Sequence, residues 1–379
     1  GSYGTHKETL SFSTGLLGGH WGFQGRLSHI GSDGFIDRAS SRLNSYFMQG
    51  GYFADNTVVK LITFNGTEKT YMAWDYASKA DMEKYGRSYN PSGMYTDKDG
   101  NTAFYKNQTD NYHQQNYQLL WNQRWSPEWN TNVALHYTRG DGYYEQMKED
   151  QKLYKYLMTE ASDLRANIVR QKKMLNDFYG FIASANYNNH NGLSAVIGGG
   201  WNRYDGDHFG KVLWVKNYIG TLDPDKDYYR NNATKNDGNL YLKADYELCD
   251  GLNAYADLQY RHISYKMYGQ NDKWNSVTGD GLQQLAIHEK FDFFNPKAGL
   301  SWQINRNNRV YGSFSVAHKE PTRNNYTDGK FTEHPKAERL FDYELGYTFA
   351  NSWLNLGANL YYMDYKDQLV LTGELNEIG

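Results

Sequence analysis

The chain has 379 residues and a net charge of −3, with a mean hydropathy of −0.84. Its length suggests two or three soluble domains, but it has only six prolines and no Ser/Pro-rich or Gly/Ser-rich joint between domains. No window approaches the roughly 18 consecutive apolar residues of a membrane helix, and the lack of a basic stripe argues against nucleic acid as a partner. Tyrosine, at 35 residues, is the most frequent aromatic residue, which suits side chains at a membrane–water interface.

Fourteen segments alternate between apolar and polar side chains, from residues 5–14 to residues 353–365, and each is about ten residues long. The alternation is clearest at residues 239–248, where Leu240 and Leu242 share one face. A period of two over this length predicts β-strands with one apolar face. In a soluble sandwich that face would be the core, whereas in a membrane barrel it would meet lipid.

The connections between these segments are alternately short and long, and this asymmetry favours the barrel. Outer-membrane barrels have tight periplasmic turns and longer extracellular loops, whereas loops above about 12–15 residues are uncommon in compact domains. Aromatic residues near segment ends, such as Trp21 and Trp129, fit an interfacial girdle. We therefore predict an all-β fold, a transmembrane antiparallel β-barrel. The long connections are residues 31–42, 66–112, 141–177, 204–237, 264–288 and 318–339.

Helical spacing occurs once, at residues 144–173 within one of the long connections. Apolar residues recur there at mixed three- and four-residue intervals among charged side chains, which predicts a short helix on the extracellular rim. The residues concerned are Leu153, Leu157, Leu164 and Ile168.

The order of the connections also gives the direction of each strand. Short turns follow the odd-numbered segments, so the first segment runs toward the periplasm and the last runs outward. Bacterial single-chain barrels have an even number of strands, and both of their termini are expected in the periplasm. We therefore expect at least one strand before Gly1 and an odd number after Gly379.

Three alternating carboxylates, Asp223, Asp225 and Asp227, are candidate calcium ligands, because calcium prefers six to eight oxygen ligands. The glycine at the sixth position of an EF-hand loop is absent, since that place holds Tyr228. The alternative is a solvated acidic loop. No other cofactor is indicated, because the histidines are scattered without transition-metal spacing and no Ser-His-Asp arrangement can be argued. The chain is therefore not expected to be an enzyme.

Residues 32–41, 68–74 and above all 311–379 carry a resemblance to a known family, and three stretches within the last range are especially characteristic. They are Lys319-Glu320-Pro321-Thr322-Arg323, residues 342–347 (Asp-Tyr-Glu-Leu-Gly-Tyr) and residues 364–373. They resemble TonB-dependent outer-membrane receptors of the iron-complex type. The resemblance implies a 22-strand barrel preceded by a globular plug. Residues 1–379 would then be part of one barrel domain, with strands about two to fifteen, and the plug and about seven C-terminal strands would lie outside them.

The resemblance also implies a function in the outer membrane of a Gram-negative bacterium. Receptors of this family bind a scarce ligand from outside and import it with energy delivered by the TonB complex through the plug. At Lys319-Glu320-Pro321 the chain departs from the Arg-Ala-Pro of haem receptors, which leaves a ferric siderophore or, as the alternative, a corrinoid. A passive porin and a barrel enzyme are rival interpretations from other classes.

Siderophore pockets are lined by aromatic residues and by Arg or Lys, because ferric catecholates and hydroxamates present anionic or carbonyl oxygens around an apolar rim. The resemblance therefore suggests five ligand-binding candidates. As an alternative, the segment from Lys319 to Arg323 anchors the base of its loop by salt bridges, and the two candidates from the earlier connection belong to the aromatic girdle. The five candidates are Tyr71, Trp74, Lys319, Arg323 and Tyr326.

Overall fold

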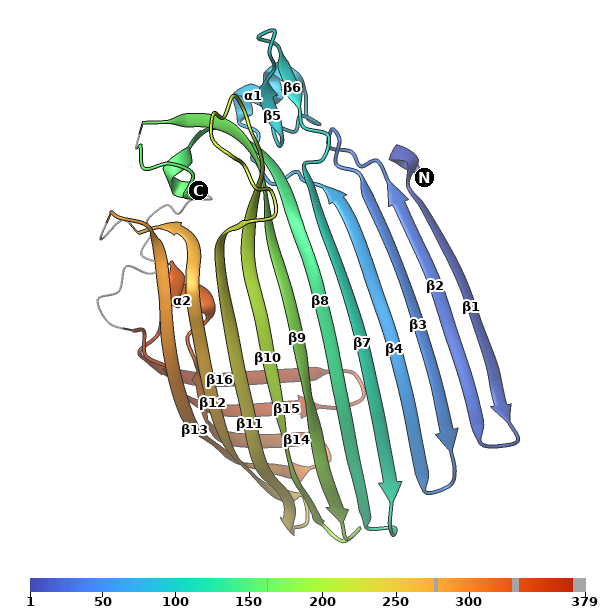
Figure 1. Cartoon of the computed structure of the whole chain (residues 1–379). Helices are drawn as coiled ribbons and strands as arrows, with labels where there is room; N and C mark the ends of the chain where they lie inside the picture. The colour runs from blue at the N-terminus through green and yellow to red at the C-terminus, as the bar shows by residue number, and fades with distance from the viewer. Residues whose placement is uncertain (162, 276–278, 329–333, 371–379) are drawn as a thin grey trace.

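The computed structural model describes residues 1–161, 163–275, 279–328 and 334–370. Fourteen strands form one antiparallel sheet, in which each strand pairs with its neighbours along the chain (Figure 1). They are β1 (His6–Leu17), β2 (Trp21–Ser32), β3 (Ser41–Phe53), β4 (Thr57–Tyr71), β7 (Thr109–Arg124), β8 (Trp129–Lys152), β9 (Arg165–Asn188), β10 (Leu193–Val215), β11 (Asp227–Cys249), β12 (Leu252–Trp274), β13 (Leu282–Asn305), β14 (Asn308–Lys319), β15 (Glu338–Ala350) and β16 (Asn355–Lys366).

The remaining elements lie in the connections. A two-stranded sheet, β5–β6, and the helix α1 lie between β4 and β7, and the short helix α2 follows β14. Two 3-10 turns, η1 and η2, precede β1 and follow β8. No helix in the described part of the chain is long and apolar enough to cross a membrane. The bounds are η1 Ser2–Gly4, α1 Lys79–Tyr85, β5 Met94–Thr96, β6 Thr102–Phe104, η2 Leu153–Tyr156 and α2 Arg323–Thr327.

Tight turns join the strands at one end of the sheet and longer connections join them at the other (Figure 1). Between β11 and β12 the turn is only Asp250-Gly251, and Gly251 has a φ of +74°, which favours glycine. The sheet curves, so that β14–β16 lie behind β9–β12 in Figure 1. This arrangement confirms the predicted all-β antiparallel fold and the alternation of short and long connections.

The apolar face of the sheet points outward. On β11, Leu240 and Leu242 are 59% and 49% exposed. Asn231, which has the opposite parity on the same strand, accepts a hydrogen bond from Arg323 of α2. The helix therefore packs on the polar face, and the apolar face is free to meet lipid, as expected of a membrane barrel and not of a sandwich core.

A row of tyrosines marks the outer edge of this apolar face. Tyr117, Tyr137 and Tyr179 lie directly opposite one another on β7, β8 and β9. Just outside them the same face becomes charged, with Arg139 opposite Asp177, whose carboxylate accepts a hydrogen bond from the Tyr137 hydroxyl at 2.6 Å. Because tyrosine and tryptophan gather at membrane interfaces, we take this tyrosine row as the outer boundary of the membrane-spanning band.

Strands β8–β13 continue far beyond the tyrosine row. Each has 23 or 24 residues, more than a membrane crossing requires. At about 3.3 Å per residue, β8 extends roughly 50 Å along its length from Tyr137 to its end at Lys152. The long connections predicted at residues 141–177, 204–237 and 264–288 are therefore wrong in extent, because most of their residues are paired strand.

The predicted helix at residues 144–173 is also wrong. These residues form the end of β8, the turn η2 and the start of β9, with Lys148 opposite Ile168 in the ladder. Of the four spaced apolar residues, Leu153 and Ile168 are buried in a core cluster at the outer end of the sheet, whereas Leu157 and Leu164 are about half exposed. This outer cluster comprises Leu153, Tyr156, Ile168, Val212, Val215, Tyr228, Tyr229 and Leu282.

Candidate functional site

A cavity of about 400 Å³ lies against the polar face, outside the tyrosine row. We call it the wall cavity, because its lining comes mainly from paired strands β7–β12, with α2 closing one side. Tyr112, Met174 and His208 stand in one row across the sheet, linked through Gly142. Since opposite residues in an antiparallel ladder project to the same face, the register of the strands alone brings these side chains together.

A β-bulge adds two tyrosines to the same side. The register of β10 against β11 shifts between Gly210 and Lys211, so the rings of both Tyr228 and Tyr229 lie beside Gly210. Their centroids are 5.0 Å apart in an edge-to-face arrangement. Tyr229 lines the wall cavity, and Tyr228 packs on Tyr156 in the outer cluster. The bulge therefore links the core at the outer end of the sheet to the cavity.

Four of the charged groups around the wall cavity form two ion pairs. Lys172 forms an ion pair with Asp272, and both side chains are about one-fifth exposed. Lys273 pairs with Asp328 at 2.6 Å. Arg323 is held by neutral acceptors instead, since its guanidinium donates to the Asn231 Oδ1 at 2.6 Å and to the Met267 sulfur at 3.5 Å. Arg323 thus brings a positive charge to the cavity that no carboxylate in the described part of the chain neutralises.

The imidazole of His208 faces the same space. Burial, with a contribution from the positive charge of Arg323, lowers the pKa of His208 to about 4. At pH 7 the ring is therefore neutral and offers one donor and one acceptor. Together with the phenols of Tyr112, Tyr144 and Tyr229, it gives the cavity neutral aromatic surfaces among its charged groups.

Of the five predicted ligand-binding residues, Arg323 is the one that lines the wall cavity, and two others lie close to it. Trp74 is half exposed, and its ring meets Tyr144 edge-to-face with the centroids 5.3 Å apart. Tyr326 is buried in an apolar cluster with Met267, and its hydroxyl has no partner within the described residues. Burial raises the pKa of Tyr326, so the phenol stays neutral.

The other two predicted residues, Tyr71 and Lys319, are not brought to the cavity. Tyr71 lies in the core of the connection between β4 and β7, where its hydroxyl donates to the Tyr105 carbonyl at 2.9 Å. Lys319 is exposed at the end of β14, opposite Glu338 in the ladder. Both remain candidates only if a ligand extends beyond the wall cavity.

Sequence reasoning missed most of the cavity lining, because the residues concerned fall in segments predicted as long loops. A period-two signal was present, since residues 204, 206 and 208 (Tyr, Gly and His) alternate with charged residues at positions 203, 205 and 207. Continuing β10 through them would have placed His208 on the polar face. The missed lining residues are Tyr112, Tyr144, Lys172, His208 and Tyr229.

The candidate calcium ligands are engaged elsewhere. Asp225 pairs with Lys211 at 3.3 Å, and Asp227 pairs with Arg230 at 2.8 Å. The Asp223 carboxylate accepts the backbone N–H of Asp225 at 2.9 Å. Among the residues that the structure describes, no three His, Cys, Asp or Glu side chains gather as a metal site would require. These pairings agree with a solvated acidic loop, and the calcium site stays a prediction.

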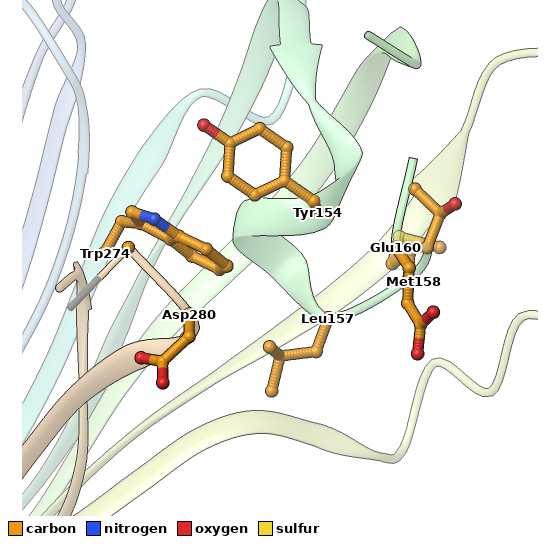
Figure 2. A pocket seen from close by; sticks show the side chains of 9 residues that line it. Tyr154, Leu157, Met158, Glu160, Trp274 and Asp280 are labelled. Carbon is orange, nitrogen blue, oxygen red and sulfur yellow. The ribbon is translucent and has the colours of Figure 1, made fainter. Parts of the chain in front are cut away.

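A second cavity, of about 700 Å³, lies between the tips of the β8–β9 and β12–β13 connections (Figure 2). Tyr154 and Trp274 meet there edge-to-face with centroids 4.6 Å apart. Figure 2 also shows Leu157 and the carboxylates of Glu160 and Asp280 around the space. Because its charged lining is acidic, this tip cavity matches an anionic ligand less well than the wall cavity does.

The chain matches the family model described as "TonB dependent receptor-like, beta-barrel" over residues 10–378. No curated protein sequence matches it significantly. Similar solved structures include the ferric-catecholate import receptor Fiu from E. coli K12 (open form; TM-score 0.65, 11% identity, 97% of this chain and 58% of that chain). Two others are the siderophore receptor PiuA from Acinetobacter baumannii (0.67, 11%, 95% and 55%) and the ferric yersiniabactin uptake receptor FyuA from Yersinia pestis (0.64, 12%, 97% and 53%).

At these identities the likeness to solved structures shows the fold alone. The chain spans little more than half the length of each of these three relatives. Their ligands, as named in their descriptions, are therefore properties of those proteins.

Proposed function

The chain belongs to the TonB-dependent receptor-like β-barrel family, and we propose that it forms the wall of an outer-membrane receptor that binds a ferric siderophore and imports it with TonB-coupled energy. Its relatives of this fold are described as import and uptake receptors and not as enzymes. The family supports the transport role. The ligand is the part that we infer from the wall cavity.

The wall cavity is the observation that carries the proposal. It lies outside the membrane band and so faces ligands arriving from the medium. Arg323 offers a guanidinium without a carboxylate partner in the described part of the chain, which suits the anionic oxygens of a ferric complex. Tyr112, Tyr144 and Tyr229 supply aromatic surfaces for its apolar rim. Trp74, which meets Tyr144 edge-to-face, adds a further aromatic surface beside this lining.

The remaining steps of transport are assigned to parts outside these 379 residues. We propose that the TonB-contacting segment lies in a plug domain, and that the described strands belong to a larger barrel, of 22 strands in this family. About half of the length of the solved relatives is matched here, which supports this division. Binding followed by a change of access requires no covalent chemistry.

Binding and growth measurements on the full-length protein test the proposal. We expect a strain lacking the gene to lose growth on a ferric tris-catecholate or a ferric tris-hydroxamate as the iron source. The Arg323→Gln variant should bind the same complex about tenfold more weakly, because a hydrogen bond to a charged group is lost. Arg309→Gln, at the other end of β14, is the matched control, since Arg309 contacts Ser301 far from the cavity.

Three results would contradict the siderophore assignment. Binding of a corrinoid in place of both ferric complexes would favour the alternative ligand class. Uptake that does not depend on TonB would indicate a passive porin. Equal binding by Arg323→Gln and the unaltered protein would remove the wall cavity from the ligand site.

A further inference from the structure

We propose that Glu320 is a positioning residue, which holds Arg323 at the wall cavity through an ion-pair network with the inner face of β11 and β12. The inference rests on the proposed function, since it concerns the same cavity. Glu320 itself does not line the cavity and would act only through the placement of α2.

The network joins two cations and two carboxylates. The Glu320 carboxylate is paired with Lys235 Nζ and accepts from Arg261 Nη1 and Nη2, both at 3.2 Å. Arg261 also donates to Asp237, from Nε at 2.9 Å and from Nη2 at 2.5 Å. The side chains of Glu320 and Asp237 are only 15% and 12% exposed. The two cations and two carboxylates therefore balance each other in charge where little water reaches them. Removing one of these side chains would leave another charge there without a partner.

Two attachments fix the segment along one strand. Arg323 and Glu320 are three residues apart, and they reach Asn231 and Lys235 respectively, both on the polar face of β11. These two strand positions are about 13 Å apart at the usual rise per residue. Two contacts at that separation set both the position and the direction of the segment, which neither contact could do alone.

The backbone between Glu320 and Arg323 is restricted, so the position of Glu320 determines that of Arg323. Pro321 lies between them and restricts the backbone. Thr322 then caps α2, with its backbone N–H donating to the Asn325 side chain at 2.7 Å. The first turn of α2 thus begins at a fixed point after Glu320, so a displaced Glu320 carboxylate would rotate or shift Arg323.

The attachment at the far end of α2 is weaker. Asp328 pairs with Lys273, but its side chain is half exposed, and exposed ion pairs contribute little. Tyr326 packs among apolar side chains, which resist removal but do not fix direction. Glu320 is therefore the attachment that we expect to set the direction of the guanidinium.

The test combines a ligand-free measurement with binding, on the full-length receptor. Nitroxide labels at Asn324→Cys on α2 and Gln115→Cys on β7, with the exposed Cys249 replaced by serine, report the position of α2 by pulsed electron paramagnetic resonance. We expect Glu320→Gln to shift or broaden the distance distribution. The conservative variant Glu320→Asp, which keeps the carboxylate, should largely retain the native distribution.

Binding of a ferric tris-catecholate and a ferric tris-hydroxamate then decides whether Glu320 acts through Arg323. Glu320→Gln should weaken binding about tenfold, as Arg323→Gln does, and the double variant should lose no more than either. The matched control is Glu338→Gln, since Glu338 ends the same connection and forms no ion pair within the described residues. This control should change neither the distance distribution nor the binding of the ferric complexes.

The outcomes separate the two proposals. An unchanged distance distribution in Glu320→Gln overturns the positioning role, whatever the binding result. A changed distribution with additive losses in the double variant also overturns it, because Glu320 would then not act through Arg323. If neither ferric complex binds the unaltered receptor, the proposed function fails, and the labels still report whether Glu320 places α2.

Discussion

His208 shows how a single side chain of the wall cavity depends on its surroundings. Its ring opposes Met174 in the ladder and shares the cavity with Arg323. Burial disfavours the charged imidazolium and the nearby guanidinium disfavours it further, so the pKa of His208 falls to about 4. A neutral imidazole there can accept a hydrogen bond from a ligand as well as donate one.

This lowered pKa predicts a pH dependence of stability. The unfolded chain takes up a proton on this histidine near pH 6.5, whereas the folded protein does so only near pH 4. The stabilising contribution is therefore complete above pH 6.5 and is lost as the pH falls toward 4. We expect His208→Gln to lose less unfolding free energy than the unaltered protein over this interval. Urea titrations in detergent would measure it, with His288→Gln on an exposed position as the control.

At Gly210 the surrounding side chains leave no space for a Cβ atom. A Cβ atom there would lie 2.3 Å from Tyr229 Cε1 and 2.6 Å from Tyr228 Cε1. We expect Gly210→Ala to destabilise the protein by about 1–3 kcal/mol through overpacking and to push Tyr229 into the wall cavity. Thermal unfolding and ligand binding would measure both effects. Gly66→Ala is the control, because nothing lies within 4 Å of its added Cβ, and a loss there equal to that at Gly210 would contradict the packing argument.

At the scale of elements, polar contacts with β8 hold the connection between β4 and β7, and Glu145 makes two of them. Glu145 accepts hydrogen bonds from the Tyr105 hydroxyl at 2.5 Å and from the Asn107 side-chain amide at 2.7 Å. It also accepts from Gln171 of β9 at 2.7 Å. A long connection carrying α1, β5 and β6 is thereby attached to the rigid sheet.

We expect Glu145→Ala to release this connection without unfolding the barrel. Leaving buried donors unpaired costs about 2 kcal/mol, which corresponds to roughly 30-fold faster amide hydrogen exchange across residues 94–108. Hydrogen–deuterium exchange with mass spectrometry would show it. Glu83→Ala on α1 is the control, since its pair with Lys79 is exposed. Unchanged exchange in Glu145→Ala would mean that other contacts hold the connection.

The alternation of apolar and polar residues predicted the strands inside the membrane far better than the outer parts of β8–β13 beyond the tyrosine row. Around Leu240 and Leu242 the lipid-facing side is apolar and the other side polar, so the period of two is plain. Just beyond the tyrosine row, polar residues occupy both faces, as at Asp207 and His208 on β10, and the contrast between the faces weakens. The strand continues there because its backbone pairs with the neighbouring strands. The polarity of its side chains does not show this pairing.

The candidate site was predictable only where a local motif carried it. Arg323 was found through the stretch that begins at Lys319, and it does line the wall cavity. Tyr71 was singled out by residue type, but its direction depends on the register of β4, which places it in the core of the connection. The role proposed for Glu320 depends on Lys235 and Arg261, which are far from it in the sequence.

At the scale of the whole molecule, the outer surface is divided into bands by height. Rows of apolar residues below the tyrosine row give way to charged residues above it. On β8, Leu135 and Tyr137 are followed on the same face by Arg139 and Asp141. The position of the protein in the membrane is therefore fixed by side chains spread over many strands.

This banding predicts that the same substitution has different effects at two heights. Leu242→Arg, in the middle of the apolar band, should destabilise the folded protein by about 2–4 kcal/mol in lipid. Leu175→Arg, on the outward face of β9 beyond the tyrosine row, should cost less than about 1 kcal/mol. Equilibrium unfolding in lipid vesicles compares them. Equal losses would show that the tyrosine row does not mark the membrane boundary.

The construction of the wall cavity from paired strands limits how such a site can diversify. Inserting one residue just before Asp207 in β10, without a β-bulge to absorb it, would turn His208 outward and Asp207 inward, and every partner beyond the insertion would be exchanged. A new ligand can therefore be accommodated by changing residues at alternate positions, but not by lengthening a strand. We expect relatives with other cargoes to keep the lengths of β8–β12 and to differ at every second residue of their outer halves, whereas the connections at the tips are free to grow or shrink.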